Sequence, residues 1–363
     1  MRNLTLAERV LVFLDSLEHI EYKHKKSIIE LYGDITQIFT DNQPIERYFK
    51  SVGKEGIVKS LRLSLSDREI FETAVESALE GADDVITLAS NGYPSELRQI
   101  PTPPIVLYTR GNTELLKSKK FAIVGSRRTL PLYAKKTEEI SSKLAEGGTA
   151  IVTGIADGAD TSAIKGALKS GRVISVFAGE VKNAYPVRAN ELARKIIEAG
   201  GLIISEYPSG TVPRVYSYPV RNRIIAGLSL GTLIVSGEFT SGTRYTAGYA
   251  ADYGKEVFAL PYGLGTGGEI CKSLIKNGAA MVESAEEIAE CLGLSLVDEK
   301  NEDIELTEIE KAVYKLIKQG IGDTDEIAER SQIAIYEIIS ALGMLELKGL
   351  VIKDGSGSYG AIK

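Results

Sequence analysis

Between residues 84 and 292 the chain alternates short, largely apolar segments with stretches whose apolar residues recur every three or four positions. The short segments have the length of β-strands, and the stretches between them have the period of amphipathic helices. A strand that is apolar on both faces belongs in a parallel sheet covered by helices on both sides. The strand-like segments are 85–88, 105–108, 121–124, 150–152, 173–177, 202–204, 233–235 and 257–260.

This alternation predicts an α/β fold with an extended Rossmann-like parallel sheet over residues 84–292. Residues 1–83 have helical periodicity and few strand signals, so we expect a small helical domain of the SAM or helix-hairpin-helix kind. The polar segment 293–303 predicts a linker. Residues 304–363 predict a winged-helix domain, because three helices and a strand follow one another at 306–317, 323–330, 333–347 and 350–353.

The net charge of −6 is distributed unevenly along the chain. Residues 117–292 carry 22 lysines and arginines against 17 acidic residues, whereas every other region is acidic. A basic region attracts polyanions, so the central domain is where we expect nucleic acid or phosphate to bind.

Residue content argues against several kinds of site. The only histidines are His19 and His24 in the N-terminal part, which excludes histidine-based catalysis in the central domain. Cys271 and Cys291 have no histidine near them and fit neither a zinc site nor a disulfide scaffold, so we expect no metal and no cofactor. The apolar run 10–14 is too short for a signal peptide or a membrane span, so we expect a cytoplasmic protein that does not bind membranes.

Three turns that follow predicted strands carry residues suited to phosphate. Glycine lets a ligand approach the backbone, a guanidinium grips phosphate with two parallel donors, and a helix N-terminus adds amides and a positive dipole end. Turns at the carboxyl ends of parallel strands meet at one edge of the sheet. A purely structural turn capped by Asp160 is the alternative for the second of them. The candidate phosphate-binding residues are Gly125, Ser126, Arg127, Arg128, Thr153, Gly154, Asp160, Arg221, Asn222, Arg223, Ser241, Gly242 and Thr243.

Seven motifs occur in one order along the chain. They are Gly125-Ser126-Arg127, Thr153-Gly154 to Asp160, Tyr185-Pro186 to Asn190, Ser205-Glu206-Tyr207-Pro208, Pro219 to Ser229, Ser241-Gly242-Thr243 to Ala247, and Leu274-Ile275 to Ala279. In this order they resemble the DNA-processing protein DprA/Smf family, whose longer members also carry the flanking helical and winged-helix domains.

The resemblance implies a bacterial protein of competence that binds incoming single-stranded DNA during natural transformation, protects it and loads the RecA recombinase. It also implies a homodimer formed through the Rossmann-like domain and no catalytic activity. By motif position, Arg127 corresponds to the family's DNA-gripping arginine. Arg221, Asn222 and Arg223 are expected to line the same pocket.

Departures from the family pattern leave two other functions open. Asp157 and Ile164 stand where family members usually carry arginine and histidine, and an acid beside a phosphate site weakens its attraction for polyanions. A Rossmann-like nucleotide-binding sensor is therefore one alternative. A nucleotide phosphoribohydrolase is the other; however, Thr246 stands where the related enzymes place a catalytic glutamate, so we expect no enzymatic activity.

The winged helix differs from a duplex-reading domain in its charge. Residues 332–347, the expected recognition helix, contain no lysine or arginine, and residues 303–363 carry 7 cationic side chains against 11 acidic ones. Reading the major groove relies on cationic and amide side chains. We therefore expect a protein-contact role such as dimerisation, regulation or RecA binding. Ile288 and Leu292 could also contribute to a dimer or could pack in the core.

Overall fold

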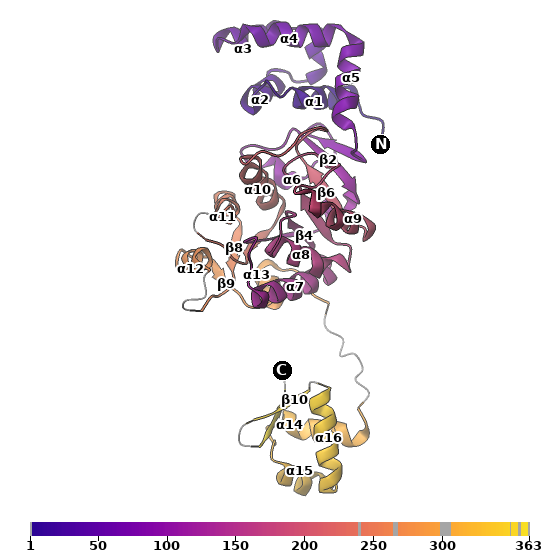
Figure 1. The fold of residues 1–363 in the computed structure, drawn as a ribbon, viewed down its shortest axis with the longest axis vertical. Helices are drawn as coiled ribbons and strands as arrows, with labels where there is room; N and C mark the ends of the chain where they lie inside the picture. The colour runs from indigo at the N-terminus through magenta and orange to yellow at the C-terminus, as the bar shows by residue number, and fades with distance from the viewer. Residues whose placement is uncertain are drawn as a thin grey trace. The chain divides into compact units, whose positions relative to one another are not determined.

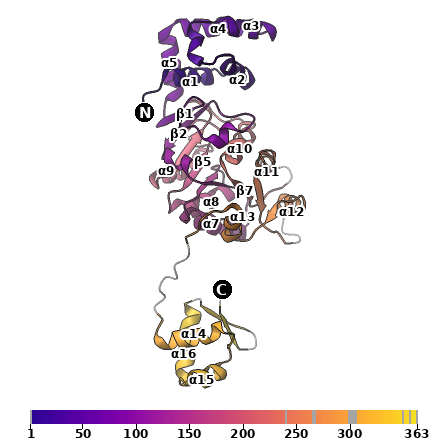
Figure 2. The same ribbon diagram turned by 180° about the vertical axis from the view of Figure 1, so that it is seen from behind.

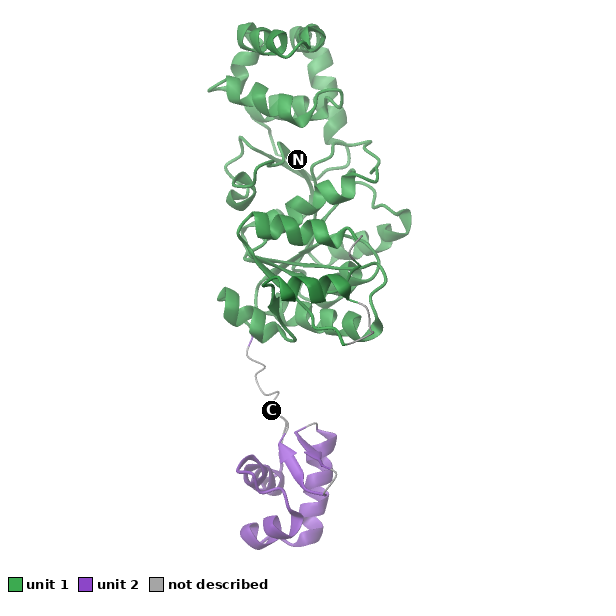
Figure 3. Ribbon diagram, turned by 90° about the vertical axis from the view of Figure 1, so that its left-hand side faces the viewer, with its two compact units in different colours: residues 1–296 green, residues 297–363 purple. Residues whose placement is uncertain are grey.

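The computed structural model describes residues 2–238, 241–263, 268–297, 306–348, 350–354 and 357–361. The chain divides into two compact units, residues 1–296 and residues 297–363 (Figure 3). The predicted linker at 293–303 falls partly outside the described residues, and the domain boundaries given above stay predictions. Within the described ranges, no helix has the length and apolar character needed to cross a membrane.

A nine-stranded sheet forms the centre of the larger unit, in the order β1-β2-β6-β5-β4-β3-β7-β8-β9. All neighbours from β6 to β9 are parallel, whereas β2 pairs antiparallel with both β1 and β6. The mostly parallel sheet confirms the predicted α/β fold. The strands are β1 (Asp84–Thr87), β2 (Val106–Gly111), β3 (Lys120–Val124), β4 (Ala150–Thr153), β5 (Val173–Val176), β6 (Leu202–Ser205), β7 (Gly231–Ile234), β8 (Glu256–Ala259) and β9 (Ala280–Met281).

Helices cover both faces of this sheet, which is why its central strands are mostly apolar and buried on both faces (Figures 1 and 2). Along β3, Phe121 and Ile123 enter one core with α7, α8, α9 and α13, while Ala122 and Val124 enter a second core with α6, α10, α11 and α12. The helices are α6 (Ser95–Arg98), α7 (Pro131–Glu146), α8 (Ala159–Leu168), α9 (Asn190–Glu198), α10 (Ser217–Leu228), α11 (Thr243–Asp252), α12 (Glu269–Lys276) and α13 (Ala285–Leu292).

The N-terminal part is helical, as predicted, and its apolar residues join the first of these cores. Of the two residues left open between core and dimer contact, Ile288 is fully buried in the same core and Leu292 is partly buried against it. The N-terminal helices are α1 (Leu6–Ser16), α2 (Tyr22–Leu31), α3 (Gln43–Ser51), α4 (Glu55–Ser66) and α5 (Arg68–Leu79).

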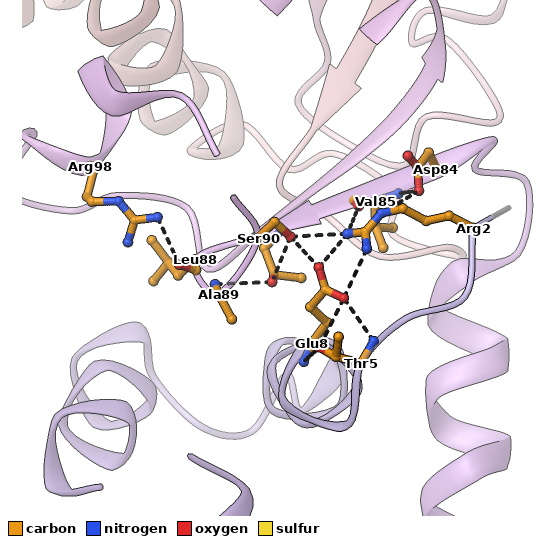
Figure 4. A network of polar contacts seen from close by, with 10 residues as sticks. Arg2, Thr5, Glu8, Asp84, Val85, Leu88, Ala89, Ser90 and Arg98 are labelled. Carbon is orange, nitrogen blue, oxygen red and sulfur yellow. Dashed lines mark hydrogen bonds and ion pairs between the residues drawn. The ribbon is translucent and has the colours of Figure 1, made fainter. Parts of the chain in front are cut away.

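A polar network centred on the buried Glu8 ties the start of the chain to β1 and the turn after it (Figure 4). Glu8 accepts hydrogen bonds from Arg2 Nη1 at 3.0 Å, from Ser90 Oγ at 2.6 Å and from the Thr5 backbone at 2.9 Å. Arg2 also donates to the carbonyl of Val85 at 3.2 Å. These bonds lower the pKa of Glu8 to about 2, chiefly through the hydrogen bond from Arg2.

The smaller unit has the order of a winged helix and a separate apolar core, built around Val313, Ile327, Ile338 and Leu345. Both observations confirm the predicted fold of the C-terminal part. Its elements are α14 (Glu308–Lys318), α15 (Thr324–Ser331), α16 (Ile335–Leu347), β10 (Val351–Lys353) and β11 (Tyr359–Ala361).

Candidate nucleic-acid and phosphate site

An open cavity of about 470 Å³ lies at the carboxyl ends of the central strands. It sits between β3 and β7, where the strand order reverses because β4 to β6 lie on one side of β3 and β7 to β9 on the other. Parallel sheets bind ligands at such a switch point. Ten of the thirteen candidate residues line the cavity: Gly125, Ser126, Arg127, Arg128, Asp160, Arg221, Asn222, Ser241, Gly242 and Thr243.

The turn after β3 forms one wall and supplies two exposed cations. A Cβ atom on Gly125 would lie 2.7 Å from Ala159, so only glycine lets this turn pass α8 so closely. Ser126 holds the turn by accepting from the amide of Arg128 at 3.0 Å. Arg127 lies over the ring of Tyr218, 5.8 Å from its centroid. Within the described residues neither Arg127 nor Arg128 has a carboxylate partner, so both charges are available to a ligand.

Asp160 and Arg221 form the floor of the cavity. Both are buried; Asp160 accepts from the amide of Ala156 at 3.2 Å, and Arg221 donates to the carbonyl of Val176. Burial raises the pKa of Asp160 and lowers the pKa of Arg221, and each charge partly offsets that effect on the other. Arg221 is therefore held rigidly, with its orientation set before any ligand arrives.

Thr153 and Gly154 lie beneath this floor instead of lining the cavity. Thr153 is fully buried and donates to the carbonyl of Ile123 at 2.7 Å. A Cβ atom on Gly154 would lie 2.4 Å from Asp160 Oδ2 and 2.7 Å from Arg221 Nη2. These two residues support Asp160 and Arg221 from below, and neither is placed to contact a ligand in the cavity directly.

Arg223 does not lie in the cavity, and the expectation that it lines the pocket with Arg221 is wrong. Its guanidinium forms a two-pronged ion pair with Glu206, at 2.8 Å and 2.6 Å, and also donates to Thr102 Oγ1 at 3.2 Å. Both charged groups are largely buried. The pair joins α10 to the segment after β6 and serves the fold.

The N-terminus of α11 forms the opposite wall. Gly242 accepts a hydrogen bond from Asn222 Nδ2 at 3.3 Å, which links this turn to α10. The hydroxyl oxygens of Ser241 and Thr246 are buried and find no hydrogen-bond partner among the described residues. Buried hydroxyls normally have partners, and here they stand beside the positive end of a helix. An oxyanion in the cavity would supply the missing acceptors.

Sequence reasoning did not identify several residues that complete the cavity. Asp157, singled out as a departure, forms an ion pair with Arg188 across the rim. These residues are 31 positions apart, and no local pattern connects them. The other lining residues not foreseen include Tyr185, Pro186, Pro213, Tyr218, Glu238 and Thr246.

Nothing in the described part of the chain gathers three or more potential metal ligands. The carboxylates that line the cavity are Asp157, Asp160 and Glu238. Asp157 is engaged by Arg188, and Asp160 lies next to Arg221. The geometry favours holding an anion over supplying an acid and a base.

Comparisons with known proteins agree with this fold along the chain. Residues 84–293 match the family model for DNA recombination-mediator protein A, and residues 298–355 match that for the DprA winged helix domain. Protein Smf of Escherichia coli is 34% identical over 340 residues, which are 90% of this chain and 91% of that protein. DNA processing protein DprA of Bacillus subtilis is 37% identical over 57% of this chain and 70% of that protein.

Two solved structures extend the likeness to three dimensions. DNA processing protein A of Streptococcus pneumoniae superposes with a TM-score of 0.62 at 26% identity, covering 80% of this chain and 98% of that one. DNA processing protein A of Helicobacter pylori, described for its single-stranded DNA binding mode, has a TM-score of 0.53 at 30% identity, covering 58% of this chain and 95% of that one. This chain therefore belongs to the DNA recombination-mediator protein A family, the DprA/Smf proteins.

Proposed function

We propose that this protein binds single-stranded DNA in natural transformation, with the strand's phosphates held in the cavity at the β3–β7 switch point. The observation that carries the proposal is the convergence of Arg127, Arg128 and Arg221 with the unpartnered hydroxyls of Ser241 and Thr246 in one open cavity. Arginines and hydroxyls of this kind hold a phosphodiester backbone without reading its sequence. The relative from Helicobacter pylori, described by its single-stranded DNA binding mode, supports the same choice of ligand.

Binding of a labelled dT oligomer across a salt series tests this proposal. We expect a shift at about 50 mM salt that weakens steadily as salt rises, because neutralising phosphates releases counterions. Arg127→Ala combined with Arg221→Ala should abolish the shift. Arg194→Ala, an exposed arginine of α9 outside the cavity, is the matched control and should bind like the parent. No shift by the parent protein, or full binding by the double variant, would refute the proposal.

We propose further that the protein acts as a homodimer, protects the bound strand and loads RecA onto it, without catalysis of its own. Support for these finer roles comes from family membership. Light scattering measures the dimer, nuclease digestion of a bound dT strand measures protection, and the rate of RecA filament growth measures loading. A monomer, an unprotected strand or an unchanged filament rate would each remove the corresponding role.

A nucleotide sensor is the second candidate, because a cavity of about 470 Å³ has the size of a small-molecule site. A nucleotide that binds only the folded state raises the melting temperature, and the increase grows with the ratio of its concentration to its Kd. Stabilisation by a mononucleotide but not by a dT oligomer would favour the sensor. Release of free base from AMP would instead revive the phosphoribohydrolase alternative.

A further inference from the structure

Tyrosines recur along α11 and at its C-cap, beginning two residues after Thr243, which lines the cavity. Tyr245, Tyr249 and Tyr253 follow one another at four-residue spacing and so lie along one side of the helix. Tyr245 is 42% exposed, and the rings of Tyr249 and Tyr253 are stacked with centroids 6.0 Å apart. Thr246 and Ala247, between them in sequence, are buried. Tyr245 therefore lies on the side of α11 that faces away from the sheet, and Tyr249 is half-buried.

One cationic side chain, Arg244, accompanies the exposed end of this row of tyrosines. The guanidinium of Arg244 lies over the ring of Tyr245, 5.0 Å from its centroid, and no carboxylate pairs with it among the described residues. Within α11 the single acidic residue is Asp252, at the far end of the helix. An uncompensated arginine beside an exposed ring is a combination that attracts a phosphate and a base together.

Packing against the core explains the presence of Tyr253 but not that of Tyr245. Burial raises the pKa of the Tyr253 hydroxyl to about 12, and its ring packs against the core of the larger unit. Tyr245 has no such cover. A Cβ atom on the exposed Gly248 would meet nothing within 4 Å, which shows open space beside the two outer rings. The described chain leaves this surface available to a ligand.

The aromatic residues of α11 follow cavity-lining residues directly in the sequence. Ser241, Gly242 and Thr243 line the cavity, and Arg244 and Tyr245 come directly after them on the same helix. α11 lies on the outside of the larger unit, next to α10 (Figure 1). A strand whose phosphate rests on the start of α11 would therefore meet these rings on leaving the cavity.

We propose that single-stranded nucleic acid leaving the cavity continues along α11, with its bases stacked on Tyr245 and Tyr249 and a phosphate neutralised by Arg244. This proposal rests on the proposed function and adds a second contact region to it. Successive rings are separated by about one helical turn, roughly 6 Å along the axis. Stacking on aromatic rings tolerates any base, as a sequence-independent binder requires.

Affinity measured at two strand lengths tests the proposal. We compare a dT oligomer of about 4 nucleotides, which fills the cavity, with one of about 16, which also reaches α11. In the full-length chain, Tyr245→Ala with Tyr249→Ala should weaken binding of the long oligomer about 5-fold or more for each ring, and leave the short one unchanged. Tyr245→Phe with Tyr249→Phe should restore binding, because the rings are kept. Tyr336→Ala, which removes an exposed tyrosine from α16, is the control.

Each outcome has one meaning. Loss confined to the long oligomer, with rescue by phenylalanine, supports the proposal. Unchanged binding of the long oligomer overturns it and leaves the proposed function standing, whereas failure of the parent protein to bind either length removes both. Equal weakening at both lengths overturns it, because the rings would then support the cavity itself. A change of oligomeric state in the alanine variant, seen by light scattering, would assign the surface to a second copy of the chain.

Discussion

Arg221 and Arg223 lie two residues apart on α10, yet one guanidinium forms the floor of the cavity and the other pairs with Glu206 outside it. Residues two apart on a helix point to different sides of it. α10 therefore directs Arg221 toward a ligand in the cavity, whereas Arg223 anchors the helix to the segment after β6 through Glu206. A change at Arg221 should therefore lower the affinity for DNA, whereas a change at Arg223 should lower the stability of the fold.

We predict that Arg223→Ala destabilises the protein by about 3–5 kcal/mol, because it leaves the carboxylate of Glu206 buried without its partner. Urea unfolding measures this loss. The folded fraction at low temperature should still bind a dT oligomer. The double variant Arg223→Met, Glu206→Leu should recover much of the stability, since no unpaired charge remains. Stability equal to the parent in the single variant would contradict the structural role assigned to Arg223.

The different positions of Arg221 and Arg223 could not be predicted from the sequence. The sequence predicts that the segment from Tyr218 to Gly227 grips phosphate, and a turn there would allow both of its arginines to face the ligand. The structure makes it the helix α10, whose period separates them. The strands were easier to predict, because burial on both faces makes most of their residues apolar. The antiparallel β2 and the two-residue β9 were not foreseen, since strand direction and very short strands leave little signal in a sequence.

The ion pair of Asp157 and Arg188 should weaken the affinity of the cavity for single-stranded DNA. Both side chains are exposed at the rim of the cavity, so the pair holds one cation away from an incoming phosphate. We predict that Asp157→Asn strengthens binding of a dT oligomer about 2- to 5-fold at low salt, because Arg188 is released and one negative charge is lost. Anisotropy titration measures the change. Glu191→Gln removes an exposed acid of α9 outside the cavity and should have a smaller effect; weaker binding by Asp157→Asn would show that the pair supports the site.

The anchoring network at the N-terminus predicts a pH dependence. The pKa of Glu8 is lowered to about 2 in the folded protein, because its ionised form accepts hydrogen bonds from Arg2 and Ser90. These bonds are made in the native state and not in the unfolded chain. A group with a lowered pKa contributes stability above its unfolded value near 4.5, and that contribution is lost as pH falls toward 2.

We therefore expect Glu8→Gln to cost about 3 kcal/mol at pH 7 and progressively less below about pH 4.5. Chemical unfolding of parent and variant across this range measures the difference. Glu69→Gln, an exposed acid of α5, should show no such trend. A difference between parent and Glu8→Gln that stays constant from pH 7 to the acid range would mean that the charge of Glu8 is not what stabilises the network.

The last prediction concerns the winged helix. α16 presents Tyr336, Ile339 and Leu347 to solvent, 72%, 59% and 83% exposed, and it contains no cation with which to contact phosphates or bases. A domain that reads duplex DNA places cations and amides on that helix. We predict that residues 297–363, which have their own core, fold as an isolated fragment and do not shift a duplex at about 50 mM salt. Circular dichroism establishes that the fragment folds, and the full chain with a dT oligomer is the positive control. A duplex shift by the folded fragment would assign DNA binding to an acidic domain and would overturn its proposed role in protein contacts.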